Sequence, residues 1–305
     1  MDGEFDIVVA GCGLAGLNAA LTSARLGRRT LALGGMLGGQ LLSINKIDGY
    51  PGFPDGIAGY DLCPIAQEQA AAAGAEFAAA DVTNLAPQDG RWLVGTADSR
   101  TYSARGVVIA TGANLKELGV PGEERLRGKG VSHCASCDAP LLRGKIAGVV
   151  GGGDSAAQEA LTLAESVERV ILFHRGGTLR AQRAYRDSVS QRPNIEIRLN
   201  TTVAEVLGDA HVTGVRTSDG AVDLAGLFIY IGMEPNTDFL DGRLALDDTG
   251  RIGTDPEMRT ALRGVAAAGA VRSGWLGRAV ISAGEGAAAA LAIDRFLTDD
   301  RWRED

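Results

Sequence analysis

The chain has 305 residues, 45% of them hydrophobic and 22% charged, and it carries a formal net charge of −8 at pH 7. This composition is ordinary for a globular protein, and the negative charge disfavours a general role in binding nucleic acid or anionic membrane, since both need a basic face. The length exceeds what one hydrophobic core usually serves, so two domains are expected.

The N-terminal segment MDGEFDIVVAG has acidic residues where a signal peptide needs positive charge. No apolar run in the sequence is long enough to cross a bilayer. We therefore expect a reducing, cytoplasmic setting and no membrane partner. In that setting a CxxC pair is more often redox-active or metal-binding than a permanent disulfide.

The first predicted elements are a strand, a tight loop and a helix. Residues 5–10 form an apolar run, GCGLAG follows, and LNAALTSARLG predicts a helix that ends at Gly27. The glycines of the loop permit the turn, let backbone N–H groups approach a pyrophosphate, and let helix and strand pack closely. A second strand (residues 30–33) follows, so the segment predicts a dinucleotide site. That strand ends Leu33-Gly34-Gly35, without the Asp or Glu that commonly holds the adenosine ribose.

The same pattern recurs later in the chain. Residues 145–150 predict a strand, GGGDSA supplies Gly151, Gly153 and Ala156, and AAQEALTLAES continues as a helix. The following strand (residues 170–173) ends not in an acid but in His174 and Arg175, with Arg180 shortly after. Arginines in this place suit a 2′-phosphate, so the second loop predicts a site that prefers NADPH to NADH.

Between the two loops lies HCASCDAP, with Cys134 and Cys137 followed at once by Asp138. A structural zinc needs four ligands, and the remaining cysteines fall inside the first loop (Cys12) and on a predicted helix (Cys63). We therefore expect no metal site. The spacing instead suits reversible disulfide formation, and a thiolate near a helix start is stabilised by the local dipole.

Two dinucleotide loops with an intervening CxxC-Asp resemble the low-molecular-weight thioredoxin reductases. Further matching segments are GGQL, YPGF, VVIATGA, FIYIGMEPNT and ISAGEGAAAAL, and the resemblance runs from about residue 5 to 297. It implies an α/β fold of two Rossmann-like three-layer domains. The FAD-binding domain would be discontinuous (residues 1–114 and 243–305), and an NADPH-binding domain (residues 115–242) carrying the CxxC would be inserted into it.

The resemblance also implies an activity. NADPH reduces FAD, the flavin reduces the Cys134–Cys137 disulfide, and the dithiol reduces thioredoxin or a similar small redox partner. Cys137 would face the flavin, Cys134 would attack the partner, and Asp138 would transfer a proton, a role that suits a carboxyl whose pKa is raised by apolar surroundings. A homodimer is also implied.

Carried over residue by residue, the resemblance predicts contacts to each cofactor. Those expected for FAD are Gly11, Gly13, Leu14, Ala15, Gly16, Gly34, Gly35, Gly39, Gln40, Leu41, Val82, Thr111, Gly112, Val271, Arg278 and Ala279. Those expected for NADPH are Gly151, Gly153, Asp154, Ser155, His174, Arg175 and Arg180.

Several ligand positions depart from the family pattern. Gly49, Ala270 and Ala279 stand where an asparagine, an aspartate and a glutamine are common, Gly176 replaces a second arginine, and Leu141 lies where aromatic residues dock thioredoxin. Two alternatives therefore stay open. One is a flavin-dependent dithiol oxidase acting on a small molecule, and the other is a degenerate relative with weakened flavin or NADPH binding.

Overall fold

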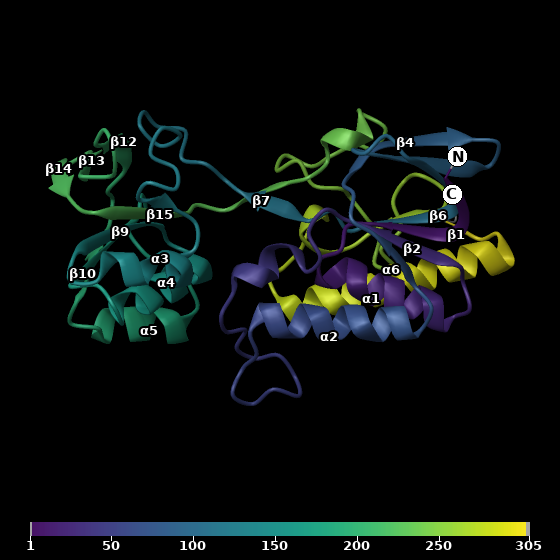
Figure 1. Ribbon diagram of the computed structural model, residues 1–305, viewed down its shortest axis with the longest axis horizontal. Helices are drawn as coiled ribbons and strands as arrows, with labels where there is room; N and C mark the ends of the chain where they lie inside the picture. Colours follow the sequence, from purple (N-terminus) through teal and green to yellow (C-terminus); the bar gives the residue numbers. More distant parts are fainter. Residues whose placement is uncertain (1, 303–305) are drawn as a thin grey trace. The chain divides into compact units, whose positions relative to one another are not determined.

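The protein is represented by a computed structural model that describes residues 2–302, apart from the side chain of Ser136. The chain forms two compact units (Figure 1). Unit 1 runs to Asn114 and resumes at Glu234, and unit 2 comprises Leu115–Met233. Strands β7 (Ala113–Leu115) and β16 (Met233–Pro235), which pair with each other, carry the chain from one unit to the other and back.

Unit 1 is built on a seven-stranded sheet with the order β3-β2-β1-β6-β5-β4, and β17 also pairs with β6. Strands β1, β2, β3, β6 and β17 are mutually parallel, whereas β4 and β5 are antiparallel additions. The bounds are β1 (Gly3–Ala10), β2 (Thr30–Leu33), β3 (Glu76–Ala78), β4 (Val82–Gln88), β5 (Arg91–Thr96), β6 (Thr101–Ile109) and β17 (Val265–Ala267).

Helices cover one face of this sheet, and α1 packs between α2 and α6 (Figure 1). Ile7 and Val9 of β1 join the helix-side core, while Val8 lies in the core on the opposite face. This alternation is the period of two that a strand imposes. The helices are α1 (Leu14–Arg25), α2 (Gly59–Ala72), α6 (Ala279–Asp299) and the short 3₁₀ helices η1 (Gly39–Ser43), η3 (Asp238–Leu240) and η4 (Gly269–Val271).

The contact between α1 and α6 is unusually close. A Cβ atom built on Gly286 would lie 2.0 Å from the carbonyl oxygen of Ala15, whereas one built on Gly284, on the exposed side of α6, meets nothing within 4 Å. Glycine at 286 therefore sets the distance between the two helices.

Gly286→Ala is expected to lower the free energy of unfolding by about 1–3 kcal/mol, because the added methyl group must push the helices apart. Gly284→Ala, the matched control on the same helix, should raise it by up to about 1 kcal/mol, since alanine is the better helix former. Chemical denaturation of the two variants measures both effects. Equal destabilisation would contradict the assigned role of Gly286.

Unit 2 is built on a five-stranded parallel sheet with the order β11-β10-β9-β15-β8. Helices α3, α4 and α5 belong to one face, and a separate antiparallel sheet (β12-β13-β14) packs on the other, which gives three layers. The bounds are β8 (Val131–Ser132), α3 (Ala135–Asp138), η2 (Ala139–Leu142), β9 (Ile146–Gly151), α4 (Asp154–Ala164), β10 (Arg169–Phe173), α5 (Arg183–Gln191), β11 (Ile195–Arg198), β12 (Val203–Leu207), β13 (Gly214–Thr217), β14 (Gly220–Asp223) and β15 (Gly226–Tyr230).

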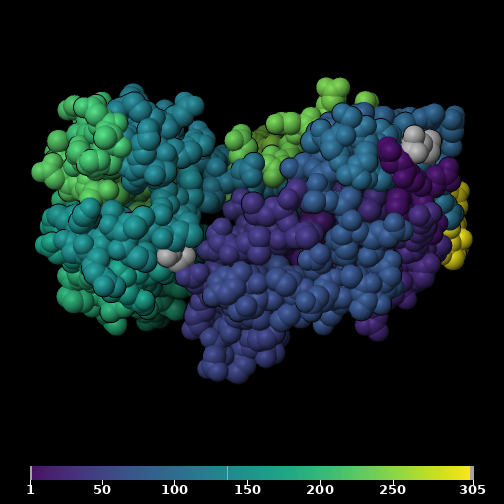
Figure 2. Space-filling model, viewed as in Figure 1, coloured from purple at the N-terminus to yellow at the C-terminus, as the bar shows by residue number. Residues whose placement is uncertain are grey.

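One feature differs from the pattern expected from the sequence. The chain returns to unit 1 at Glu234 rather than at residue 243. The reason is that Asn236 already bonds to unit 1: its side chain donates to the carbonyl of Thr111 (2.9 Å), and its N–H donates to the carbonyl of Gly112 (3.0 Å). In addition, residues 44–58 form a largely exposed loop that projects from unit 1 (Figures 1 and 2) and carries Gly49.

Candidate active site

The CxxC segment lies at the carboxyl edge of the parallel sheet of unit 2. It follows β8, whose Ser132 pairs with Phe228 of β15, and in turn Tyr230 of β15 pairs with Gly151 of β9. Because parallel strands end at the same edge, the CxxC segment and the second glycine loop, which follows β9, lie at one edge of one sheet. This is where open α/β sheets bind ligands.

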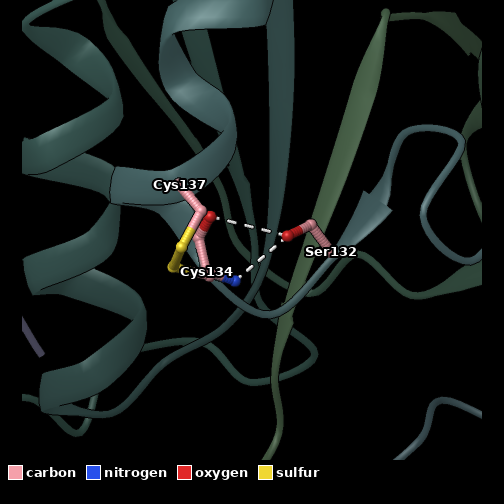
Figure 3. Close-up of a disulfide and its surroundings, with 3 residues drawn as sticks. All are labelled: Ser132, Cys134 and Cys137. Carbon is pink, nitrogen blue, oxygen red and sulfur yellow. Dashed lines mark hydrogen bonds between the residues drawn. A yellow bond between two sulfur atoms is a disulfide. The ribbon is translucent and has the colours of Figure 1, made fainter. Parts of the chain in front are cut away.

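Cys134 and Cys137 form a disulfide, with their Cα atoms 5.3 Å apart. Cys134 is the residue that precedes α3, and its N–H donates to the hydroxyl of Ser132 (3.1 Å), which donates back to the Cys134 carbonyl (3.5 Å) (Figure 3). Cys137 is exposed and Cys134 half-buried. Ser132 therefore anchors the backbone at the start of the disulfide loop, while a sulfur-bearing residue stays accessible.

A carboxyl group and a phenol lie behind this loop. Glu159 of α4 accepts a hydrogen bond from the N–H of Ala135, and burial raises the pKa of its carboxyl above the ordinary 4.5. The hydroxyl of Tyr230 is buried and makes no hydrogen bond of good geometry, yet it lies close enough to Glu159 to interact with it. Burial, and then the charges of Glu159 and Asp138, raise the pKa of Tyr230. Asp138 is therefore near Tyr230, although its own role in proton transfer stays a prediction.

The raised pKa of Glu159 predicts a specific pH dependence of stability. The folded state favours the neutral carboxyl, so its contribution is complete below about pH 4.5 and is lost as the pH rises through the folded pKa. Glu159→Gln cannot ionise, so its free energy of unfolding, relative to the unmodified chain, should increase over that interval. Denaturation at a series of pH values measures this. The exposed Glu168, changed to Gln, is the control, and parallel curves for all three proteins would contradict the prediction.

The second glycine loop joins β9 to α4. A Cβ on Gly152 would lie 2.3 Å from the ring of His174, so the buried imidazole supports the loop from beneath. A Cβ on Gly153 meets nothing within 4 Å, and Gly153 precedes the first turn of α4. The loop thus leaves open space over the N-terminus of a helix, which suits a phosphate group.

Basic residues lie at the same edge. Arg175 follows β10 and is exposed, and the exposed Arg180 has its N–H bonded to the carbonyl of Gly152 (2.7 Å). Asp154, expected to contact NADPH, accepts hydrogen bonds from the backbone N–H (2.7 Å) and side-chain amide (2.5 Å) of Gln182, while Ser155 is exposed on the first turn of α4. Two arginines therefore stand beside the phosphate loop, and Asp154 ties the segment after Arg180 to the start of α4.

The first glycine loop repeats this arrangement in unit 1. Gly11 has φ +114°, and a Cβ there would lie 2.1 Å from the carbonyl oxygen of Ala110, while one on Gly16 would lie 1.8 Å from that of Gly11. A Cβ on Gly13 meets nothing within 4 Å. Gly11 and Gly16 are thus required by packing, whereas the protein itself places no atom where a side chain of residue 13 would be.

Other expected FAD contacts gather around this loop. A Cβ built on Gly39 would lie 3.4 Å from the Cα of Gly13. Gly39 is the first residue of η1, and Gln40 and Leu41 follow it. Leu14 and Ala15 open α1, and five further expected residues follow the carboxyl ends of neighbouring strands. These are Gly34 and Gly35 after β2, Thr111 and Gly112 after β6, and Val82, which comes after β3 and is the first residue of β4.

The last group of expected residues lies at the start of α6 and in η4. Arg278 precedes α6 and Ala279 is its first residue, whereas the side chain of Val271 is fully buried in the core, so only its backbone is placed to meet a ligand. Beside Ala270, the buried Glu285 accepts hydrogen bonds from the N–H of Gly269 (2.8 Å) and from Arg272 (2.5 Å). The side-chain Nε of Arg272 is buried without a hydrogen-bond partner.

Within residues 2–302, no group of three or more His, Cys, Asp and Glu side chains is arranged to hold a metal ion. Over the same residues, no helix combines the length and apolar character needed to traverse a membrane. Cys12 and Cys63 are buried thiols, and burial raises their pKa values to about 12 and about 11. They stay protonated at neutral pH and are therefore poor nucleophiles.

Three polar features of these sites were missed from the sequence: Asp81 beside Gly35, Glu159 behind the disulfide, and the pair of Arg272 with Glu285. Only Asp81 had a local signal, since it follows a short strand that ends at the same edge as β2. Helical periodicity does not indicate that the side chains of Glu159 and Glu285 face the backbone of neighbouring loops rather than solvent.

Comparison with known proteins agrees with this geometry. The sequence matches the family described as pyridine nucleotide-disulphide oxidoreductase over residues 5–286. It is 38% identical to a thioredoxin reductase of Treponema pallidum, covering 97% of this chain and 98% of the relative. The structure is similar to those of thioredoxin reductases from Lactococcus lactis (FR conformation; TM-score 0.92, 33% identity, 97% and 99% covered) and T. acidophilum (TM-score 0.90, 34% identity, 97% and 99% covered). The chain therefore belongs to the pyridine nucleotide-disulphide oxidoreductases and, among them, to the low-molecular-weight thioredoxin reductase family.

Proposed function

We propose that this enzyme, an NADPH-dependent flavoprotein disulfide reductase, passes electrons through the Cys134–Cys137 pair to the disulfide of thioredoxin. The observation that carries the proposal is the redox disulfide at the same sheet edge as a phosphate loop flanked by Arg175 and Arg180. Relatives named thioredoxin reductase, matched over almost their whole length, support thioredoxin as the acceptor.

The residues of unit 1 fit FAD. The open space at Gly13, together with the N-terminus of α1, suits a pyrophosphate, because backbone N–H groups and the helix dipole favour negative charge there. The unpartnered, buried Nε of Arg272 adds an available donor near η4. We assign the FAD domain to the unit that runs to Asn114 and resumes at Glu234.

The residues of unit 2 fit NADPH. Gly153 and the start of α4 form the pyrophosphate cradle, and Arg175 and Arg180 are placed for the 2′-phosphate. His174 supports this loop rather than contacting the cofactor through its ring, because the ring is buried beneath Gly152. A Cβ built on Gly176 would lie 3.0 Å from the same ring. Because residue 176 carries no charge, Arg180 supplies the second positive charge beside Arg175.

FAD, which the Gly13 loop and the start of α1 would hold, would supply the two-electron reduction of the Cys134–Cys137 disulfide at the expense of NADPH. The Cys134 thiolate then attacks one sulfur of the thioredoxin disulfide, a mixed disulfide forms, and the other thioredoxin sulfur leaves and takes up a proton. The Cys137 thiolate attacks the Cys134 sulfur, which re-forms the internal disulfide and releases the second thioredoxin sulfur with a second proton. Asp138, half-buried beside the pair, is the nearest carboxyl in sequence to exchange these protons.

A second candidate exists for the electron acceptor. Leu141, just after the disulfide, is 74% exposed and offers an apolar rather than an aromatic surface. A small-molecule disulfide or dithiol is therefore the second candidate. We further propose a homodimer and a cytoplasmic setting, the latter because a cycling CxxC needs a reducing compartment.

The test is an anaerobic titration of the FAD-saturated protein with NADPH, followed by oxidised thioredoxin or a small-molecule disulfide. We expect NADPH to bleach the flavin absorption band and thioredoxin to restore it. If only the small-molecule disulfide restored the flavin absorption band, that compound rather than thioredoxin would be the acceptor. A flavin that NADPH leaves oxidised, but that a dithiol bleaches, would overturn the reductase direction and favour a dithiol oxidase.

A further inference from the structure

The adenosine end of the first dinucleotide site lacks its usual carboxylate. In such folds an Asp or Glu at the end of the second strand hydrogen-bonds the ribose. Here β2 ends at Leu33 and continues with two glycines. A ribose hydroxyl bound here would need an acceptor from another element at the same edge of the sheet.

The neighbouring strand supplies one. β3 pairs with β2 in parallel, with Ala78 opposite Leu33, so both strands end at the same edge. Gly34 N–H donates to the Ala78 carbonyl (3.2 Å), and the chain then turns toward Asp81. The N–H of Ala97 donates to the Asp81 carbonyl (2.9 Å), which holds the backbone of this turn in place.

The Asp81 carboxylate points back to the end of β2. Its Oδ1 accepts the N–H of Gly35 (2.8 Å), and a Cβ built on Gly35 would lie 2.7 Å from its Oδ2. Residue 35 must therefore be glycine for the carboxylate to lie this close. A carboxylate has about four acceptor positions, and the side chain is exposed, so a ligand can reach those that Gly35 does not use.

Asp81 is also close to the phosphate loop. A Cβ on Gly34 would lie 2.8 Å from the backbone nitrogen of Cys12, between Gly11 and Gly13. Burial is the main cause of the raised pKa of Cys12, and the charge of Asp81 is the second. The carboxylate thus lies beside the loop that faces the pyrophosphate. In FAD, the pyrophosphate is bonded directly to the adenosine ribose.

We propose that Asp81 accepts a hydrogen bond from a hydroxyl of the adenosine ribose of FAD and so supplies the carboxylate that β2 lacks. This rests on the proposed assignment of FAD to unit 1. The assignment also explains why the first loop would select FAD and the second loop NADPH. A carboxylate at this position repels a 2′-phosphate, whereas Arg175 at the corresponding strand end of unit 2 attracts one.

The experiment displaces FAD from the full-length holoenzyme with ADP, 2′-deoxy-ADP or 3′-deoxy-ADP and measures the flavin released through an ultrafiltration membrane. For the unmodified protein we expect ADP to be about 10- to 100-fold more potent than at least one deoxy analogue, since a hydrogen bond to a charged group is lost. In Asp81→Ala this preference should disappear. Asp81→Asn should keep the Gly35 contact and a reduced preference, and Asp248→Asn, a change to an exposed carboxylate of the same unit, should leave it intact.

Two results would overturn the inference. Equal potency of ADP and both deoxy analogues on the unmodified protein would show that no carboxylate reads the ribose. Retention of the full preference in Asp81→Ala would assign it to another residue. Neither result affects the proposed function, which fails instead if the full-length chain retains no flavin after incubation with FAD.

Discussion

Cys137→Ser and Cys134→Ser are each expected to lower kcat/KM for thioredoxin reduction by at least about 10³-fold, since either change removes half of the covalent exchange. Flavin reduction by NADPH should persist in both variants, because neither cysteine belongs to a phosphate loop. The measurement is steady-state turnover with thioredoxin beside the anaerobic bleaching of the flavin. Activity within tenfold of the unmodified enzyme would exclude the disulfide from the main electron path.

The two variants also separate the roles of the sulfurs. If Cys134 attacks the partner, reduced Cys137→Ser should accumulate a mixed disulfide with thioredoxin, because no second thiol resolves it. Cys134→Ser should not, and the adduct is visible by intact-protein mass spectrometry. Adduct formation by Cys134→Ser alone would reverse the assignment. Cys12→Ser and Cys63→Ser are the matched controls, since burial keeps both thiols protonated, and each should retain activity.

Gly13→Ala and Gly153→Ala are expected to weaken one cofactor each. Because a Cβ at either position meets no protein atom within 4 Å, the fold should tolerate the methyl group, whereas a bound pyrophosphate should not. We expect Gly13→Ala to bind FAD about 10- to 100-fold more weakly with NADPH affinity unchanged, and Gly153→Ala to show the reverse. Calorimetric titration with each cofactor measures this, and denaturation checks that stability is kept.

Gly16→Ala is the contrast within the same loop. Its Cβ would lie 1.8 Å from the carbonyl oxygen of Gly11, so it should destabilise unit 1 outright rather than affect the cofactor alone. If Gly13→Ala were as unstable as Gly16→Ala, the open space at residue 13 would have a structural rather than a ligand-binding cause. If it bound FAD normally, the first loop would not be the pyrophosphate site.

The expected family, fold class and cofactors are confirmed, because the signals for them are local in the sequence. GCGLAG and GGGDSA each follow an apolar run and open a helix, and these strands and helices occur within three residues of the expected bounds. CxxC followed by an aspartate is similarly compact. The assignment of individual residues to cofactor contacts stays a prediction.

What the sequence did not reveal depends on pairs of residues far apart in the chain. Asp81 meets Gly35, 46 positions earlier, only because β3 lies beside β2 in the sheet. Thr111 and Asn236, 125 positions apart, bond at the point where the chain re-enters unit 1, which is why the boundary falls before residue 243. The pairing order of strands decides such contacts, and residue spacing alone does not express it.

The close contact of Gly286 with Ala15 bears on the order in which the protein folds during synthesis. Strand β17 and helix α6 are translated after all elements of unit 2, yet α6 covers α1 and β17 completes the sheet beside β6. Unit 2 is continuous and is finished earlier, so it can form its sheet while the first strands of unit 1 still lack their last partners. On a ribosome, the newly made chain is therefore expected to expose the apolar side of α1 until α6 emerges.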